Sequence, residues 1–148
     1  FQLANIARDV VEDDAAGRCY LPAIWLVEED IEPGQHTKPH HRQELADMAA
    51  RLVRRMEVHA ASSRIGAARL PFRCRWAILS AARIYTAIGR EVLAKGTAAW
   101  DHRVYTSKAQ KIGHALAALV EALVNRPPKL DDEPRWRRSD LAENAASA

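Results

Sequence analysis

The sequence predicts an all-α protein in the form of a helical bundle with four principal helices. Two observations carry this prediction. Apolar residues recur every three or four positions in four separate segments, which is the spacing of an amphipathic helix. No stretch alternates apolar and polar residues over the length of a strand, as a half-buried β-strand would. With 148 residues, 48% of them apolar, the chain has the composition of one ordinary globular domain.

The first predicted helix covers residues 1–13 and has two chemically distinct faces. One face carries the apolar side chains between Leu3 and Val11. The helical rotation places four polar side chains together on the opposite face: Gln2, Asn5, Asp9 and Asp13. The helical pattern is already under way at Gln2 with no capping residue before it. We therefore expect the chain to be a piece of a longer protein.

A polar connection is predicted between the first two helices. Asp13–Gly17 ends the first helix, residues 18–25 form a loop that contains Pro22, and Glu32–Gln35 form a turn around Pro33 and Gly34. Three histidines follow: His36, His40 and His41. A zinc site would need a fourth ligand and a rigid frame, so we expect these histidines to be solvated.

The second predicted helix covers residues 41–68. Its arginines lie mostly on one side, and the buried side is predicted to carry Leu45, Met48, Leu52, Met56 and Ile65. Proline suits the first turn of a helix, so Pro71 is predicted to begin a third helix that runs to about Leu93.

Apolar residues cover most of the circumference of this third helix: Phe72, Trp76, Leu79, Ile84, Tyr85, Ile88 and Val92. A helix with that pattern is expected to be buried on most sides, which requires more neighbours than three further helices provide.

The last predicted helix begins at Thr106 or Ser107 as N-cap and runs to about Val124. Its predicted buried stripe is Leu116, Leu119, Val120 and Leu123. The segment 125–128 contains two prolines and ends the helix. Residues 126–148 are charged, small and poor in apolar side chains, so we expect a flexible tail after a folded region of residues 1–125.

Composition excludes several classes of protein. No apolar run reaches the roughly 20 residues needed to cross a bilayer, and residues 1–5 lack the pattern of a signal peptide, so a cytoplasmic location is expected. Cys19 and Cys74 lie far apart and outside any CxxC motif, which leaves no basis for a zinc ribbon, a redox dithiol or a disulfide scaffold.

The net charge of +3 is unevenly distributed. Residues 1–32 hold eight acidic residues and two arginines, a net charge of −6, which leaves +9 for the rest of the chain. Such a division is typical of a basic surface for nucleic acid or anionic lipid, or of an acidic cation site that faces basic groups across a shared anionic ligand.

Asp9 and Asp13 are the pair of residues most indicative of a site. At positions i and i+4 their carboxylates project side by side from one helix face. The pair either faces water or binds a hard divalent cation such as Mg²⁺, which takes carboxylate and other oxygen ligands. Asn5 offers an amide oxygen one turn earlier, Gln2 lies a turn before that, and Arg8 beside the stripe is suited to a phosphate oxygen.

The residues around this pair resemble a known motif. QLANIARDVVED at residues 2–13, with GRCYLP at 17–22, is similar to the second aspartate-rich motif of the phytoene and squalene synthase family, the head-to-head prenyl transferases. Three further stretches agree: LPFRCRWAI at 70–78, ARIY at 82–85 with IGREV at 88–92, and AWDHRVYTSK at 99–108. The resemblance covers about residues 1–125 and is greatest to bacterial phytoene synthases.

This resemblance implies a fold and an activity. The fold would be the carboxy-terminal half of an isoprenoid synthase. The activity would be condensation of two geranylgeranyl diphosphates, through the cyclopropyl compound prephytoene diphosphate, to phytoene in carotenoid biosynthesis. A squalene or dehydrosqualene type of synthase that uses farnesyl diphosphate is the alternative. The family's first aspartate-rich motif does not occur in this sequence, so we expect the 148-residue chain to be inactive alone.

The resemblance also implies roles for individual residues. Asp9 and Asp13 would bind Mg²⁺, with Mn²⁺ as an alternative ion, and Asn5 would complete the site, with Gln2 beside it. The substrate diphosphate would contact Gln2, Asn5, Arg8, Tyr85, Arg103 and Lys108. Tyr20 would lie near the ionising diphosphate. Catalysis would rest on Asp9, Asp13 and Tyr20, and the substrate partner would be a prenyl diphosphate.

Two other classes of function fit parts of the sequence. The run Arg135–Arg138 and a pI of about 9.1 suggest nucleic-acid binding, but the basic residues are spread over several helices and no recognition helix stands out, so no nucleic-acid partner is expected. The arginine-rich face between Arg51 and Arg69 suits anionic lipid. Peripheral membrane association is also compatible with an enzyme that uses lipid substrates. The sequence leaves the oligomeric state open.

Overall fold

The computed structural model describes residues 1–124. The predicted tail at 126–148 and the run Arg135–Arg138 lie outside the described residues. Within residues 1–124 every regular element is a helix and there is no strand, which confirms the all-α prediction. None of these helices is long and apolar enough to span a membrane.

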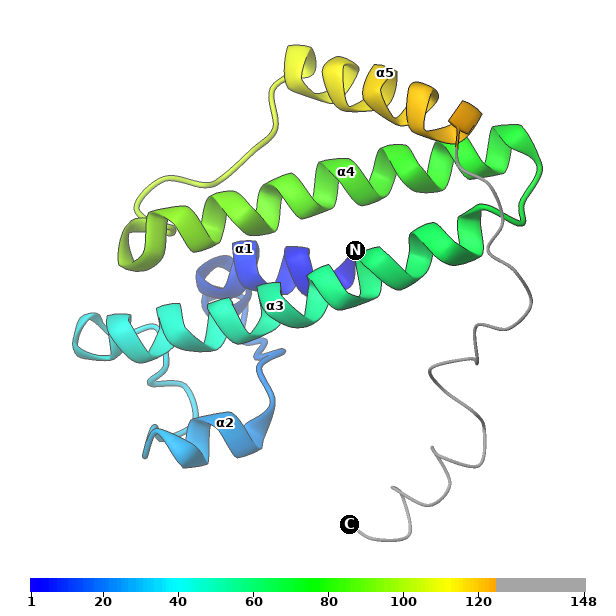
Figure 1. Ribbon diagram of the computed structural model, residues 1–148. Coiled ribbons are helices and arrows are strands. Elements are labelled where there is room, and N and C mark those ends of the chain that lie inside the picture. Colours follow the sequence, from blue (N-terminus) through cyan, green and yellow to red (C-terminus); the bar gives the residue numbers. More distant parts are fainter. Residues whose placement is uncertain (125–148) are drawn as a thin grey trace, which may run out of the picture.

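Five α-helices and two short 3₁₀ helices make up the described part of the chain. Their bounds are α1 Gln2–Ala15, α2 Ala23–Glu28, η1 Pro39–His41, α3 Arg42–Ala67, α4 Phe72–Lys95, η2 Gly96–Ala98 and α5 Lys108–Val124. The two long helices α3 and α4 lie side by side, and α5 follows α4 on the side away from α3 (Figure 1). The shorter α1 packs against both α3 and α4.

The ends of the long helices follow local sequence signals. Ser107 and Gln110 form a reciprocal cap at the start of α5. The Ser107 amide donates to Gln110 Oε1 at 2.8 Å, and the Gln110 amide donates to Ser107 Oγ at 3.2 Å. Of the two predicted caps, Thr106 and Ser107, the structure therefore uses Ser107. Pro71 directly precedes α4 as its N-cap, and Gly96, with φ of +54°, ends α4 where a side chain would be strained.

The short helix α2 was not predicted. Residues 23–25 were expected to belong to a loop, but Pro22 precedes a helix of six residues, Ala23–Glu28, that buries Trp25 and Leu26. Fewer than two turns are too short to show a helical period in the sequence. The burial of these two side chains therefore decides the structure of the segment.

The main core fills the space between α1, α3 and α4. Four of the five residues predicted on the buried side of α3 are in it: Leu45, Met48, Leu52 and Met56. The fifth, Ile65, is 47% exposed, contrary to the prediction. The main core takes residues of α3 only as far as Met56, so the carboxy-terminal part of α3 lacks the cover that α1 gives to the rest.

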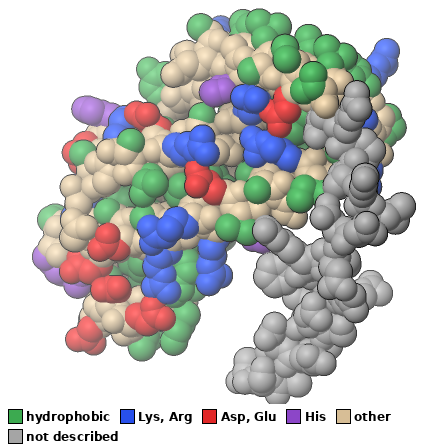
Figure 2. Space-filling model, viewed as in Figure 1, with side chains coloured by type: hydrophobic (Ala, Val, Ile, Leu, Met, Phe, Trp, Pro, Cys, Tyr) green, Lys and Arg blue, Asp and Glu red, His purple; other side chains and the backbone are tan. Residues whose placement is uncertain are grey.

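The prediction of the buried face of α5 was wrong for three of its four residues, and Leu119 is partly buried. Ala118 and Ala122 are fully buried, whereas Leu116, Val120 and Leu123 are 58–68% exposed. Alanines allow α5 to approach α4 closely. Two side chains of α4 also bind the α5 backbone: Trp76 Nε1 donates to the Ala115 carbonyl at 2.9 Å, and Arg75 Nη1 donates to the Ala122 carbonyl at 3.0 Å. Hydrophobic side chains consequently gather on the outside over α5, at the top of Figure 2.

The third predicted helix is less enclosed than expected. Phe72 and Trp76, in the first turns of α4, are 41% and 37% exposed. Burial on α4 is confined to residues from Leu79 onward, with Ala82, Ile88 and Val92 among them. The amino-terminal turns of α4 lie beyond the end of α1, so α3 and α5 alone cover them.

The loop before α3 folds back onto the end of α1. Thr37 Oγ1 donates a hydrogen bond to Asp14 Oδ2, and His36 Nε2 lies 3.7 Å from Asp14 Oδ1. His36 is completely buried, so the expectation that it is solvated was wrong, while His40 is exposed as expected. The hydrogen bond from Thr37 to Asp14 closes a loop of more than twenty residues against α1, and His41 at the end of this loop is partly buried.

A pair of leucine substitutions tests this division between core and surface. Leu45 is 0% exposed and Leu123 is 68% exposed. We expect Leu45→Ala to lower the free energy of unfolding of the 148-residue chain by about 2–5 kcal/mol, because it leaves a cavity in the core. The matched change Leu123→Ala is expected to cost less than about 0.5 kcal/mol. Urea unfolding followed by circular dichroism measures both, and equal losses would contradict this core.

Candidate functional site

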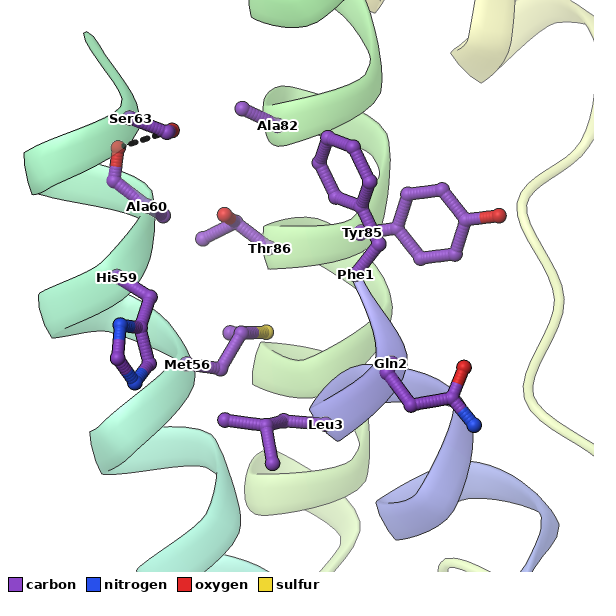
Figure 3. Close-up of a pocket in the computed structure, with 10 residues that line it drawn as sticks. All are labelled: Phe1, Gln2, Leu3, Met56, His59, Ala60, Ser63, Ala82, Tyr85 and Thr86. Carbon is purple, nitrogen blue, oxygen red and sulfur yellow. Dashed lines mark hydrogen bonds between the residues drawn. The ribbon is translucent and has the colours of Figure 1, made fainter. Parts of the chain in front are cut away.

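An apolar cavity opens between α1, α3 and α4. It has a volume of about 390 Å³ and is drawn in Figure 3. Three helices supply its lining: Phe1, Gln2 and Leu3 from the start of α1; Met56, His59, Ala60 and Ser63 from α3; and Ala82, Tyr85 and Thr86 from α4. The size is at the lower end of the range for small-molecule pockets.

Aromatic rings form one wall of this cavity. The rings of Phe1 and Tyr85 stack with their centroids 5.0 Å apart (Figure 3). Tyr85, a predicted site residue, therefore lies on the cavity wall, and Gln2 lies at the same end of α1. Thr86 is buried beside them, and its hydroxyl has no hydrogen-bond partner among the described residues.

Sequence analysis did not identify the α3 residues of this wall. Met56, Ala60 and Ser63 follow one another at spacings of four and three, which places them on one helix face. Met56 was predicted to be buried in the core, and Ala60 and Ser63 were not singled out. The structure shows that the same face continues past the core into the cavity lining.

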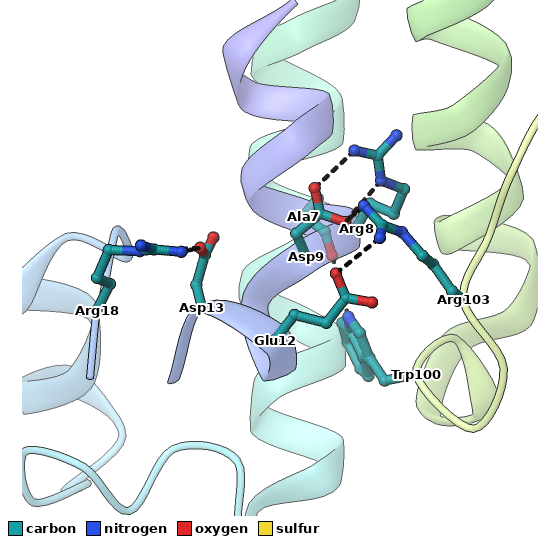
Figure 4. Close-up of polar contacts among 8 residues, drawn as sticks. All are labelled: Ala7, Arg8, Asp9, Glu12, Asp13, Arg18, Trp100 and Arg103. Atoms are coloured by element: carbon teal, nitrogen blue, oxygen red, sulfur yellow. Dashed lines mark hydrogen bonds and ion pairs between the residues drawn. The ribbon is translucent and has the colours of Figure 1, made fainter. Parts of the chain in front are cut away.

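The polar stripe of α1 continues from this cavity toward the end of the helix. Asp9 and Asp13 occupy successive turns, and their side chains are only 17% and 18% exposed. The two carboxylates are therefore largely covered by other groups, unlike a repelling pair that simply faces water. Figure 4 shows that each is directed at a different arginine.

Asp9 binds two arginines that come from distant parts of the sequence. Arg8 holds it with two hydrogen bonds, from Nε to Oδ1 at 2.7 Å and from Nη2 to Oδ2 at 2.6 Å. Arg103, in the segment that follows η2, donates from Nη2 to Oδ1 at 3.1 Å and also pairs with Glu12 at 3.2 Å (Figure 4). The structure thus brings three predicted site residues, Arg8, Asp9 and Arg103, into one cluster.

Asp13 has an arginine of its own. Arg18 Nη2 donates to Asp13 Oδ1 at 3.1 Å, and Arg18 Nε lies 3.4 Å from the same oxygen. Arg18 was not among the predicted site residues. Its signal in the sequence is its place in the GRCYLP segment, where the turn after α1 brings the chain back toward Asp13.

The electrostatic environment keeps Asp9 ionised. Burial raises the pKa of the Asp9 carboxyl, but the hydrogen bonds and positive charge of Arg8, reinforced by Arg103, outweigh burial and leave that pKa below its ordinary value of 3.8. The hydrogen bond to Asp9 in turn raises the pKa of the Arg8 guanidinium, while burial acts in the opposite direction.

Trp100 fixes the position of α1 relative to this cluster. Its indole Nε1 donates to the carbonyl of Ala7 at 3.1 Å, and the Arg42 guanidinium lies 5.7 Å from its ring. Trp100 lies three residues before Arg103. The same segment therefore holds the backbone of α1 and supplies one of its cations.

The other predicted site residues lie outside this cluster. Asn5 is partly buried on the polar stripe of α1, between Gln2 and Asp9. Tyr20 is 50% exposed in the loop after α1. Lys108 is exposed at the start of α5 and makes no ion pair with the part of the chain that the structure describes.

The donor set on the α1 stripe fits a hard cation. Asn5, Asp9 and Asp13 offer only oxygen ligands, which Mg²⁺ and Mn²⁺ accept. Within residues 1–124 no group of three or more His, Cys, Asp and Glu side chains is arranged to hold a metal ion. Two carboxylates and an amide match Mg²⁺ that completes its shell with water and phosphate.

Comparisons with known proteins identify the family of the chain. The profile of the family described as squalene/phytoene synthase matches residues 1–110. The chain is 44% identical over 133 residues to a 15-cis-phytoene synthase of Pantoea ananas, which covers 87% of this chain and 43% of that protein. It is 41% identical over 140 residues to a phytoene synthase of Pseudescherichia vulneris, with 93% and 45% covered.

A third relative is more similar over a shorter stretch. A 15-cis-phytoene synthase of a Paracoccus strain is 47% identical over 113 residues, which covers 76% of this chain and 36% of that protein. The chain thus spans less than half the length of these curated relatives. No solved structure matches the chain.

The lowered pKa of Asp9 predicts a dependence of stability on pH. Because the folded-state pKa lies below 3.8, the stability that ionised Asp9 contributes is fully present above about pH 3.8 and is lost as the pH falls through the folded-state value. The difference in unfolding free energy between the unchanged chain and Asp9→Asn should therefore shrink toward the acid end. Urea unfolding between about pH 2 and 7 measures it. A difference that stays constant over this range would contradict the assignment.

Proposed function

The chain belongs to the squalene/phytoene synthase family, and from this we propose that the whole protein condenses two geranylgeranyl diphosphates head-to-head to phytoene through prephytoene diphosphate. The relatives reported above are named phytoene synthases. Their names favour a C20 substrate over the farnesyl diphosphate of the squalene-type alternative.

One structural observation carries the proposal. A helix whose first residues line an apolar cavity bears, farther along, two carboxylates that are each bonded to arginine. An allylic diphosphate likewise has an apolar part and a charged part. Its hydrocarbon chain needs an apolar space, and its diphosphate group needs cations. The order of these groups along α1 supports substrate binding with the diphosphate near Asp9 and the chain toward Phe1.

Asp9, Asp13 and Asn5 are proposed to hold Mg²⁺. The bound ion would neutralise negative charge that develops on the departing diphosphate. The family's other aspartate-rich motif would supply further carboxylates from a part of the protein that this chain does not contain. This division explains why we expect the 148-residue chain to be inactive alone.

The arginines are proposed to exchange their carboxylate partners for phosphate oxygens. Arg8 and Arg103 already hold the Asp9 carboxylate at 2.6–3.1 Å, and the Arg103 side chain is 54% exposed, so it can turn toward an anion bound beside α1. Arg18 stands in the same relation to Asp13. Guanidinium groups placed beside the diphosphate in this way would stabilise the negative charge that develops as it leaves. Tyr20 and Lys108 remain proposed contacts on the strength of the family motif.

The cavity is proposed to protect the carbocation that forms when diphosphate leaves. Its lining is mainly apolar, which excludes water, and the stacked rings of Phe1 and Tyr85 present π faces that stabilise positive charge. A volume of about 390 Å³ is small for two C20 chains. The remainder of the longer protein would therefore supply the opposite wall.

We expect Asp9→Asn in the full-length protein to lower turnover by about 10²–10³-fold or more, because a neutral amide binds the cation more weakly than a carboxylate and forms no ion pair with Arg8. Helix content should stay unchanged, since Asn preserves the shape of the side chain. Radiolabelled geranylgeranyl diphosphate and product chromatography measure turnover.

Glu12→Gln is the matched control for this substitution. Glu12 lies on the same helix, but its side chain is about half exposed and forms an ion pair with Arg103. We expect its turnover to stay within about threefold of the unchanged protein. Full activity in Asp9→Asn, or equal losses in both variants, would refute the role given to Asp9.

A second pair of variants tests the cavity. Ala60 lines it, whereas its neighbour Ala61 is exposed and does not. We expect Ala60→Phe to reduce kcat/KM for geranylgeranyl diphosphate by about tenfold or more, because the added ring occupies space meant for the prenyl chain. Ala61→Phe should have little effect.

The choice between C20 and C15 substrates has its own experiment. Incubation of the full-length protein with labelled geranylgeranyl and farnesyl diphosphate, followed by identification of the hydrocarbons, separates phytoene from squalene-type products. Squalene or dehydrosqualene as the main product would replace the proposed activity by the alternative.

We also propose that the protein works at a membrane surface, since its substrate and product are lipids.

A further inference from the structure

Gly89 is a buried glycine within α4. It lies one turn after Tyr85 and three residues after Thr86, so the helix face that lines the cavity continues to a position without a side chain. Glycine inside a helix is less favourable than alanine. Gly89 lies within a regular helix and its φ is not positive, so its backbone conformation does not call for glycine. The missing β-carbon must therefore have another reason.

The thioether of Met56 occupies the space that a side chain at position 89 would take. A β-carbon placed on Gly89 would lie 2.8 Å from Met56 Cε and 2.9 Å from Met56 Sδ. Carbon atoms in contact are about 3.5–4.0 Å apart, so both distances are too short. The next neighbour, Val53 Cγ2, would be at 3.5 Å, an ordinary contact. A side chain at position 89 therefore fits only if the end of Met56 moves.

Met56 borders the main core on one side and the cavity on the other. It is 3% exposed, belongs to the main core and also lines the cavity. In Figure 3 its side chain lies between α3 and α4, beside Leu3. A protein core is packed without large voids, so the open space next to this side chain is the cavity of about 390 Å³. Methionine is flexible and adapts its rotamer, so a displaced Met56 would enter the cavity.

A change in cavity width of this kind alters the choice of substrate. One methylene group more or less in an apolar pocket changes discrimination by about 10–200-fold. The end of the Met56 side chain is larger than one methylene group. Its position against α4 or inside the cavity is therefore sufficient to decide which chain length fits.

We propose that Gly89 is a positioning residue for prenyl chain length. By carrying no side chain it lets Met56 lie against α4, and this keeps the cavity wide enough for a C20 chain. Met56 would contact the chain, and Gly89 acts only through Met56. The inference deepens the proposed function and rests on it for the class of substrate. The packing of Met56 on Gly89 is independent of that function.

Binding of unreactive substrate analogues by the full-length protein tests the proposal. The probes are geranyl, farnesyl and geranylgeranyl thiodiphosphate, in which sulfur replaces the oxygen that joins the chain to the diphosphate. We expect Gly89→Ala to raise the Kd of the geranylgeranyl compound by about tenfold or more, because Met56 then fills part of the cavity. The Kd of the short geranyl compound should stay within about twofold. A purely structural defect would weaken all three compounds alike.

Gly113→Ala is the matched control. Gly113 is a helical glycine of α5, and a β-carbon there would have no atom within 4 Å outside its own helix backbone and chain neighbours. The same substitution is therefore made at a position without a neighbour to displace. We expect all three dissociation constants to equal those of the unchanged protein.

A second substitution at Met56 should reverse the effect. Valine lacks the Sδ and Cε atoms that a β-carbon on Gly89 would meet. We expect Gly89→Ala combined with Met56→Val to bring the Kd of the geranylgeranyl compound back to within about threefold of the unchanged protein. Rescue of this kind requires that Gly89 acts through Met56.

Four results would overturn the proposal. They are equal weakening of all three compounds by Gly89→Ala, no rescue by Met56→Val, no binding of any compound to the unchanged protein, and a melting temperature of Gly89→Ala lowered by more than about 5 °C. The last would show that Met56 cannot move aside. Binding of the analogues without phytoene formation from the true substrate would contradict the proposed function alone, because these dissociation constants require no turnover.

Discussion

The bidentate pair between Asp9 and Arg8, extended by Arg103, is the interaction on which the site depends. It joins the acidic helix α1 to a segment more than ninety residues later in the chain. Trp100 reinforces the same junction by binding the α1 backbone at Ala7. Any movement of the segment around residue 100 would therefore be transmitted both to the orientation of α1 and to the charge that Asp9 experiences.

This arrangement separates charge from hydrocarbon along a single helix. The first turn of α1 borders the apolar cavity, and the next turns carry carboxylates and arginines. The helical repeat keeps Gln2, Asn5, Asp9 and Asp13 on one side, so the order of residues in the sequence becomes an order of environments in space. A prenyl diphosphate has the same order from its chain to its charged group, which supports the proposed mode of binding.

Much of the fold could be predicted because its signals are local. Pro71, Ser107 and Gly96 mark helix ends, and the spacing of Leu45, Met48, Leu52 and Met56 identifies a buried face that the structure confirms.

The face of α5 could not be predicted in this way, because periodicity assigns the large side chains to the interior. Close approach of alanines and backbone hydrogen bonds from Trp76 and Arg75 reverse that choice. The burial of His36 likewise depends on a tertiary contact with Asp14 that no local pattern contains. Within the candidate site, Asp9 and Asp13 follow from helical geometry, whereas Arg18 depends on how the chain turns after α1.

The pairing of the acidic stripe has a consequence for assembly of the protein. A helix that carries two carboxylates one turn apart would normally be destabilised by their repulsion until a cation arrived. Here Arg8, Arg103 and Arg18 neutralise those charges within the polypeptide itself. The fold of α1 therefore needs no bound divalent ion to offset this repulsion, and removal of divalent ions by a chelator leaves the helix intact.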